Sequence, residues 1–235
     1  MKISIIIPVY NEEKTILKII NKIQKLSYLN KELIVVNDGS TDNTEKLLNS
    51  LFDKKIKIIN HKKNLGKGAS IRTAQKYISG THVIIQDADL EYDPDDYKNL
   101  LNPFKNQKTL VVYGSRVLNK KRYMLKNFSS FERIFYNHML TLISNTINNQ
   151  KLSDAHTCYK VFKSELFKSI ILEENGFAFC PEITTKISNL NINITEVAIS
   201  YNGRNYSEGK KITYFDGFKA IFALFKYKIK KQKNY

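Results

Sequence analysis

Short runs of apolar, mostly β-branched residues alternate with helix-like patterns through the first half of the chain. Such runs predict parallel strands buried on both faces, and the amphipathic patterns between them predict crossover helices. The expected strands are 3–9, 33–36, 56–59, 83–85 and 110–113, and the expected helices are 13–26, 41–51 and 67–78. The first half therefore predicts an α/β fold built on a mostly parallel sheet.

The second half is less regular. Residues 117–127 are polar and basic without a clear period, which predicts a loop. The later segments predict helices at 128–147, 164–172, 183–190 and 213–230 and a strand at 192–201. No internal repeat or linker divides the chain, so we expect one domain over 1–235.

Polar turns follow three of the predicted strands. They are Tyr10-Asn-Glu12, Asn37-Asp-Gly-Ser-Thr-Asp42 and Gln86-Asp-Ala-Asp-Leu-Glu91. Ligands of open parallel sheets bind outside the carboxyl ends of the strands. One such turn could simply start a helix, but three acidic turns at one sheet edge predict a binding site.

The turn containing Asp87 and Asp89 has the chemistry of a metal site. Ala88 keeps the turn tight, so both carboxylates can face one ligand. Mg²⁺ and Mn²⁺ prefer hard oxygen ligands, and phosphate oxygens can complete their coordination shell. A cation held there would neutralise the charge that develops on a diphosphate leaving group.

Four motifs occur in a specific order: Ile3 to Glu12, Ile34 to Asp42, Asn64-Leu-Gly-Lys-Gly68 and Asp87-Ala-Asp89. This order resembles family 2 glycosyltransferases of the GT-A fold, especially the branch of dolichyl- and polyprenyl-phosphate sugar synthases. The resemblance covers roughly 1–205 and is strongest over 1–116. It implies a Rossmann-like, mostly parallel sheet flanked by helices, with a helical acceptor-side region and a C-terminal amphipathic helix.

The resemblance also assigns roles in binding the nucleotide-sugar donor. It places Arg116, in Gly114-Ser-Arg116, against a donor or acceptor phosphate, which suits the five donors of a guanidinium. Asp89 would serve catalysis, and Glu91 stands where the synthases often have glutamine but could still ligate the metal. The implied donor residues are Pro8, Tyr10, Glu12, Asp38, Lys67, Asp87, Ala88, Asp89 and Arg116, and the implied metal ligands are Asp87, Asp89 and Glu91.

The chemistry of the acceptor side depends on the group that accepts the sugar. A lipid phosphate is already anionic and needs no strong base, whereas a hydroxyl acceptor does. Asp154 and Glu182 match acidic positions of the synthases and are the candidates for a general base or for acceptor positioning, with Lys160 as an acceptor contact. Cys158 departs from the family by replacing a glycine. Glu182 could instead be an ordinary carboxylate at a helix N-terminus.

Two basic segments complete the second half. Arg204, Lys210 and Lys211 could bind phosphate from a lid, or lie in a solvated loop. The last helix carries an aromatic stripe and then several lysines, which is typical of a helix at a membrane interface. The stripe could also pack on the protein core. The two interpretations are compatible, because one face of the helix can pack on the core while another contacts the membrane.

Composition and charge indicate the cellular setting. The formal net charge of +16 favours anionic partners, although a lysine-rich composition could explain part of it. Two isolated cysteines predict a reduced, cytoplasmic compartment. With neither a signal peptide nor a run of the ~18–20 apolar residues that span a bilayer, we expect peripheral association with an anionic membrane surface, on its cytoplasmic face.

The sequence thus predicts an inverting glycosyltransferase that moves a hexose from a UDP- or GDP-sugar to a membrane lipid, either polyprenyl phosphate or a hydroxyl such as diacylglycerol. The predicted parts are a nucleotide-sugar half (1–116), an acceptor half (117–212) and a basic tail (213–235). A cell-surface polysaccharide intermediate is the alternative acceptor. A nucleotidyltransferase is a less favoured alternative, because such enzymes usually carry a glycine-rich loop after the first strand, where this chain has Tyr10-Asn-Glu12. A basic nucleic-acid-binding module is also less favoured, because the three turns at the sheet edge are acidic.

Overall fold

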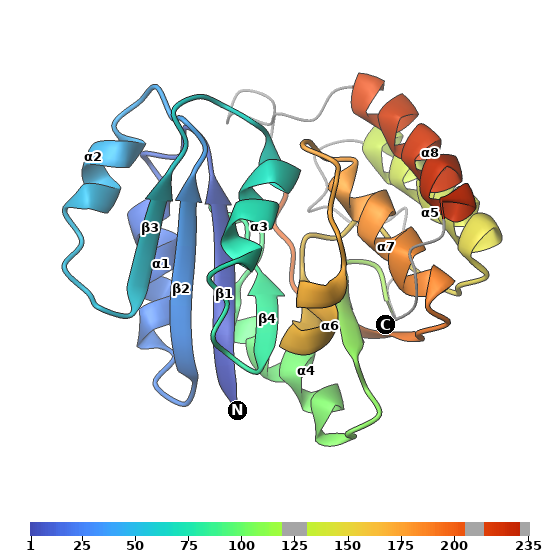
Figure 1. Ribbon diagram of the computed structural model, residues 1–235, viewed down its shortest axis with the longest axis horizontal. Helices are drawn as coiled ribbons and strands as arrows, with labels where there is room; N and C mark the ends of the chain where they lie inside the picture. The colour runs from blue at the N-terminus through green and yellow to red at the C-terminus, as the bar shows by residue number, and fades with distance from the viewer. Residues whose placement is uncertain (119–130, 205–213, 231–235) are drawn as a thin grey trace.

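A seven-stranded sheet runs through the molecule in the order β3-β2-β1-β4-β6-β5-β7 (Figure 1). The computed structural model describes residues 1–118, 131–204 and 214–230. The strands are β1 (Lys2–Val9), β2 (Asn30–Asn37), β3 (Ile56–Asn60), β4 (His82–Ile85), β5 (Val111–Ser115), β6 (Lys160–Lys163) and β7 (Ile194–Ala198).

Most of the sheet is parallel, as expected. Strand β1 pairs in parallel with β2 and β4, β2 pairs with β3, and β5 pairs with β7. Strand β6 was not predicted, and it runs antiparallel to both β4 and β5. Its sequence, Lys-Val-Phe-Lys, contains only two apolar residues between two lysines, so no apolar run predicts a strand there. Lys160 is nevertheless buried. The predicted α/β class and GT-A type of sheet are confirmed.

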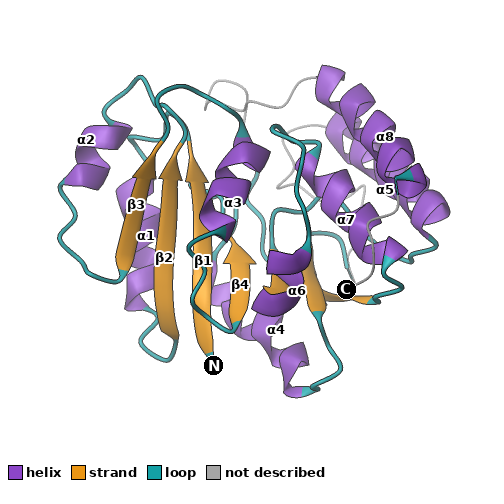
Figure 2. Ribbon diagram, viewed as in Figure 1, coloured by secondary structure: helices purple, strands orange, loops and turns teal. Residues whose placement is uncertain are grey.

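Helices cover both faces of the sheet (Figure 2): α3 lies in front of the strands and α1 lies behind them. The four isoleucines of the predicted amphipathic helix, Ile16, Ile19, Ile20 and Ile23, are fully buried on α1. The helices are α1 (Ile16–Lys25), α2 (Thr44–Asn49), α3 (Lys67–Gln75), α4 (Tyr97–Leu101), α5 (Phe131–Asn148), α6 (Ser164–Ser169), α7 (Phe179–Asn189) and α8 (Tyr214–Ile229).

Helices α5, α7 and α8 pack together at the end of the molecule farthest from β3 (Figure 1). Helix α7 begins four residues before the predicted start, at Phe179 rather than Ile183. Of the helices in the three described ranges, none has the length and apolar character needed to cross a membrane.

Candidate active site at the carboxyl ends of the strands

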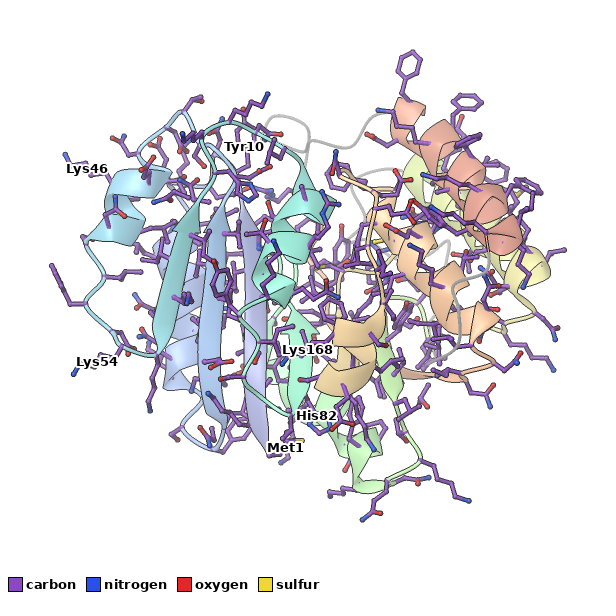
Figure 3. All side chains as sticks on the ribbon, in the orientation of Figure 1. Met1, Tyr10, Lys46, Lys54, His82 and Lys168 are labelled. Atoms are coloured by element: carbon purple, nitrogen blue, oxygen red, sulfur yellow. The ribbon has the colours of Figure 1, made fainter. Side chains whose placement is uncertain are left out.

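The turns after β1, β2 and β4 meet at one edge of the sheet. The backbone N–H of Asp38 donates to the carbonyl of Val9 at 2.8 Å, and that of Gln86 donates to the carbonyl of Ile6 at 2.9 Å. Figure 3 shows Tyr10 at this end of the strands, with Met1 and His82 at the opposite end. The structure therefore brings the three acidic turns together, as the strand order of a parallel sheet requires.

Arg204 connects two of these turns. Its terminal nitrogens donate to the two carboxylate oxygens of Glu12, each at 3.0 Å, and one of them also donates to Asp89 at 3.1 Å. The side chains of Glu12 and Arg204 are less than one-fifth exposed. A planar guanidinium that bridges two carboxylates is a strong, directional contact in such an environment.

The carboxyl group of Asp89 lies in a crowded acidic environment. Burial, and then the neighbouring charges of Asp87 and Glu91, raise the pKa of Asp89 to about 7, although Arg204 acts in the opposite direction. The neighbouring negative charges make ionisation of this carboxyl group unfavourable, so an additional cation bound there would be stabilising.

Glu91 holds the segment that carries Arg204. Its carboxylate accepts hydrogen bonds from the hydroxyl of Tyr201 and the backbone N–H of Arg204, both at 2.8 Å. Its carbonyl accepts from the N–H of Asn202 at 2.9 Å. Glu91 therefore positions Arg204 in this structure, and the metal ligation expected of Glu91 stays a prediction.

Lys67, the first residue of α3, reaches across to the metal-site turn. Its ammonium donates to Asp87 at 2.5 Å and lies 3.6 Å from the sulfur of Cys158. Burial opposes the charge on Lys67, but Asp87 outweighs this effect and raises the lysine pKa. Burial also raises the pKa of the Cys158 thiol, so the residue that replaces the family glycine is a neutral thiol that packs beside Lys67.

The start of α3 is fixed from two sides. The carboxylate of Asp38 accepts the backbone N–H groups of Leu65 and Gly66, at 3.0 and 2.7 Å, and lies 2.7 Å from a ring nitrogen of His61. On the other side, Gly66 has a positive φ of 100°, and a β-carbon there would collide with the carbonyl of Asn175. In this structure Asp38 thus shapes the turn before Lys67.

Arg116 and Asp154 form a buried ion pair. The guanidinium donates to both carboxylate oxygens, at 2.7 and 2.8 Å, and the backbone N–H of Arg116 adds a third bond at 3.1 Å. Burial opposes the ionisation of Asp154, but Arg116 lowers its pKa below the ordinary value. The guanidinium also lies 5.0 Å from the ring centre of Tyr201.

Glu182 and Lys160 lie in the interior instead of lining the acidic turns. Glu182 is fully buried; its carboxylate accepts the backbone N–H groups of Glu173 and Glu174 and binds Lys186. The ammonium of Lys160 donates to the carbonyls of Ala155 and Thr157. In this arrangement both charges support loops, and the acceptor roles of Glu182 and Lys160 stay predictions.

The remaining predicted residues are distributed as follows. Pro8 pairs with Val36 in the sheet and, like Tyr10, is half-buried, whereas Ala88 is buried inside its turn. Lys210 and Lys211 lie outside the described residues, as does most of the predicted loop 117–127.

The carboxylates suit a cation that binds few protein ligands. Within residues 1–118, 131–204 and 214–230, no three His, Cys, Asp or Glu side chains are grouped as a ready-made metal cage. Asp87 and Asp89, each less than one-fifth exposed, nevertheless offer hard oxygen ligands. Mg²⁺ or Mn²⁺ commonly completes its shell with phosphate oxygens and water. The donor set therefore fits a metal that arrives together with a diphosphate.

Two contributors escaped the sequence analysis. Tyr201 contacts both Glu91 and Arg116, and His61 joins Asp38 to Thr73. Tyr201 ends an alternating segment, and His61 immediately follows β3. Their places at strand ends could have marked them, but their partners are distant in the sequence.

Comparison with known proteins decides the family. The model of glycosyl transferase family 2 matches residues 4–171, which include all three acidic turns, Arg116 and Asp154. The chain belongs to this family. It is therefore a glycosyltransferase, and the resemblance seen in its motifs is confirmed.

Two relatives carry names from the dolichyl-phosphate branch. The UDP-N-acetylglucosamine–dolichyl-phosphate N-acetylglucosaminyltransferase of Methanococcus voltae is 29% identical, with 97% of each chain covered. The dolichyl-phosphate β-glucosyltransferase ALG5A of Trichomonas vaginalis is also 29% identical, and the match covers 85% of this chain and 65% of that protein.

A solved structure has the same fold. Glucosyl-3-phosphoglycerate synthase of Mycobacterium tuberculosis, crystallised with UDP, gives a TM-score of 0.73 at 17% identity. The match covers 99% of this chain and 81% of the synthase chain. The same synthase has also been crystallised with Mg²⁺ and UDP. At this identity the likeness establishes the fold alone.

Proposed function

We propose that this glycosyltransferase transfers a hexose from a UDP- or GDP-sugar to polyprenyl phosphate, with inversion at the anomeric carbon. The observation that carries the proposal is the cluster of Glu12, Asp87 and Asp89 at the strand ends, in which basic side chains already hold the carboxylates. The names of the Methanococcus and Trichomonas relatives support dolichyl phosphate as the acceptor class.

In the proposed reaction a phosphate oxygen of the acceptor attacks the anomeric carbon. The bond from that carbon to the nucleoside diphosphate breaks, and the departing diphosphate takes the electron pair. A bound Mg²⁺ or Mn²⁺ would neutralise charge on the diphosphate, with Asp87 and Asp89 as its protein ligands. Lys67 and Arg204, which bind these carboxylates in this structure, would contact the diphosphate.

The environment of the predicted bases favours a phosphate acceptor over a hydroxyl. Asp154 is bound by Arg116, and Glu182 is enclosed by two backbone N–H groups and Lys186. Removing either carboxylate from these contacts would leave a buried charge without its partner, which is costly. A lipid phosphate, already anionic, makes no such demand. Diacylglycerol and a polysaccharide intermediate are therefore the less favoured acceptors.

We further propose that the enzyme acts as a peripheral protein on the cytoplasmic face of a membrane, where a lipid-linked acceptor and a water-soluble donor can both reach it. Its net charge of +16 supports attraction to an anionic surface.

The test is a transfer assay with purified protein. UDP-glucose, UDP-N-acetylglucosamine and GDP-mannose are each offered with dolichyl phosphate, with diacylglycerol or with water alone, in Mn²⁺, Mg²⁺ or EDTA. We expect a sugar-phosphate lipid with one donor, lost in EDTA and in Asp89→Asn but retained in Asp95→Asn, which changes an exposed carboxylate of the same region. Transfer to diacylglycerol but not to the lipid phosphate would overturn the acceptor assignment.

A further inference from the structure

Helix α8 has two unlike faces. Ala220, Ala223, Leu224 and Tyr227 are buried against the body of the protein. The opposite face exposes large apolar side chains at intervals of three and four residues, which places them in one stripe along the helix. These residues are Phe215 (76% exposed), Phe218 (74%), Phe222 (70%), Phe225 (54%) and Ile229 (84%).

Polar contacts hold the inner face in place. Lys226 and the hydroxyl of Tyr227 bind the carboxylate of Glu174, at 2.8 and 2.7 Å, and Lys230 binds Glu173 at 2.8 Å. Asn189 of α7 donates to the carbonyl of Tyr227 at 2.8 Å. The helix is therefore docked on α7 and the adjacent loop, and this docking fixes which face points outward.

Helix α5 packs beside α8 and exposes further apolar side chains. Phe135, Tyr136, Met139 and Leu142 are between 41% and 50% exposed. Figure 1 shows both helices at the end of the molecule away from β3. These four residues and the five of the α8 stripe are called here the α5–α8 surface. Soluble monomers rarely expose so many large apolar side chains on two neighbouring helices, and such a concentration marks an interaction surface.

The charge near this surface distinguishes between partners. Asp216 is the single acidic residue in the sequence from 214 to 235, whereas the same stretch contains six lysines. Lys219 is exposed on α8, and Lys230, which pairs with Glu173, directly follows the helix. A second copy of a chain with a net charge of +16 would bring like charges together. An anionic bilayer accepts both features, because aromatic side chains favour its interface and lysines its headgroups.

The position of the surface along the chain agrees with this partner. Tyr214, where α8 begins, follows Arg204 of the active site by ten residues, a reach of at most about 36 Å. Helix α5 begins at Phe131, 15 residues after Arg116. A surface whose two helices begin 10 and 15 residues after active-site residues can hold the enzyme where a lipid acceptor is embedded.

We propose that the α5–α8 surface binds an anionic bilayer by inserting its aromatic stripe among the headgroups. The inference rests on the proposed function in one respect, because a lipid acceptor explains why the enzyme should bind a bilayer. The binding itself does not depend on the reaction. Glycosyl transfer and membrane binding can therefore be tested separately.

The first test is flotation with vesicles of phosphatidylglycerol and phosphatidylcholine in equal parts, compared with pure phosphatidylcholine. The double variant Phe218→Glu/Phe222→Glu is compared with Phe52→Glu, which changes a 99% exposed phenylalanine in the segment between α2 and β3. We expect the wild type and Phe52→Glu to float with the anionic vesicles, and the double variant to bind about tenfold more weakly or worse. Thermal melting checks that the variants are folded.

A second test uses the absence of tryptophan from the sequence. Phe222→Trp places a single fluorescent reporter on the stripe, and Phe52→Trp provides the control. The emission of Phe222→Trp should shift to the blue with anionic vesicles and be quenched by brominated lipid, whereas that of Phe52→Trp should not change. Equal responses from both reporters, or none from Phe222→Trp, would contradict the proposal.

Two further outcomes separate the possibilities. If light scattering finds a wild-type dimer that the double variant abolishes, and neither protein binds vesicles, the partner is a second copy and the proposal is wrong. If vesicle binding behaves as expected but no lipid phosphate accepts a sugar, the proposed function fails and the membrane surface stands. If the protein does not bind vesicles but still transfers sugar to a short, water-soluble polyprenyl phosphate, the membrane proposal is wrong and the proposed function stands.

Discussion

Arg204 binds both carboxylate oxygens of Glu12 at 3.0 Å, although 192 residues separate the two in the sequence. The same guanidinium contacts Asp89 at 3.1 Å. Arg204 therefore holds two acidic turns together in the position where a divalent cation would also be stabilised.

Removing that guanidinium should improve metal binding to the donor-free protein. In Arg204→Ala the cation no longer competes with an internal positive charge, so Mn²⁺ should bind severalfold more tightly in calorimetry without nucleotide. Arg204→Lys should be intermediate, because lysine keeps the charge but loses the two-pronged contact. Lys22→Ala, which breaks an exposed pair with Asp93, is the control. Unchanged affinity in Arg204→Ala would show that the two cations do not compete.

Asp89 should make the stability of the metal-free protein depend on pH. Its pKa rises from 3.8 to about 7 on folding, so the folded state retains the proton more strongly. The contribution of Asp89 to the free energy of unfolding must then decrease as the pH rises between these values. Asp89→Asn lacks this decrease and should gain stability relative to the wild type from acidic to neutral pH. Urea titrations in EDTA across that range measure the difference, and parallel curves would contradict it.

Breaking the buried pair of Arg116 and Asp154 should cost much of the fold's stability. Asp154→Asn leaves a guanidinium without its counter-charge, a loss of about 3–5 kcal/mol. The double variant Arg116→Met/Asp154→Leu removes both charges and should recover part of that loss. Urea unfolding gives both values. A double variant less stable than the single one would show that the pair contributes more than it costs to bury.

Glu182→Gln distinguishes a supporting residue from a general base. An amide cannot accept both backbone N–H groups and Lys186 with charged hydrogen bonds, so we expect a loss of stability of about 2–4 kcal/mol and a weaker apparent donor affinity. The rate constant kcat should decrease only modestly. A general base would behave in the opposite way, with stability retained and kcat reduced roughly 10²–10⁴-fold.

Local pattern explains why the first half was predictable. The isoleucines of β1 and α1 repeat with the periods of a buried strand and an amphipathic helix, and all of them occupy the core. Strand β6 lacks such a signal because lysine occupies both of its ends. Its existence depends on the space between β4 and β5, which only the folded sheet defines.

The acidic turns were predictable as a group, but their partners were not. Strand-end positions identify Glu12, Asp87 and Asp89 as neighbours in any parallel sheet of this order. The pairing of Arg116 with Asp154, 38 residues apart, and that of Arg204 with Glu12 depend on long-range packing. A sequence shows that charges are present, but which charge neutralises which is a property of the fold.

The loop between α6 and α7 has a consequence for protein engineering. Its Glu173 and Glu174 side chains bind α8, while the carbonyls of Glu174 and Asn175 press against Gly68 and Gly66 at the start of α3. The loop therefore contacts α8 through its side chains and the start of α3 through its backbone. A chimera that took α8 from a relative without residues 171–176 would misfit at Lys67, so the two segments should be exchanged as one unit.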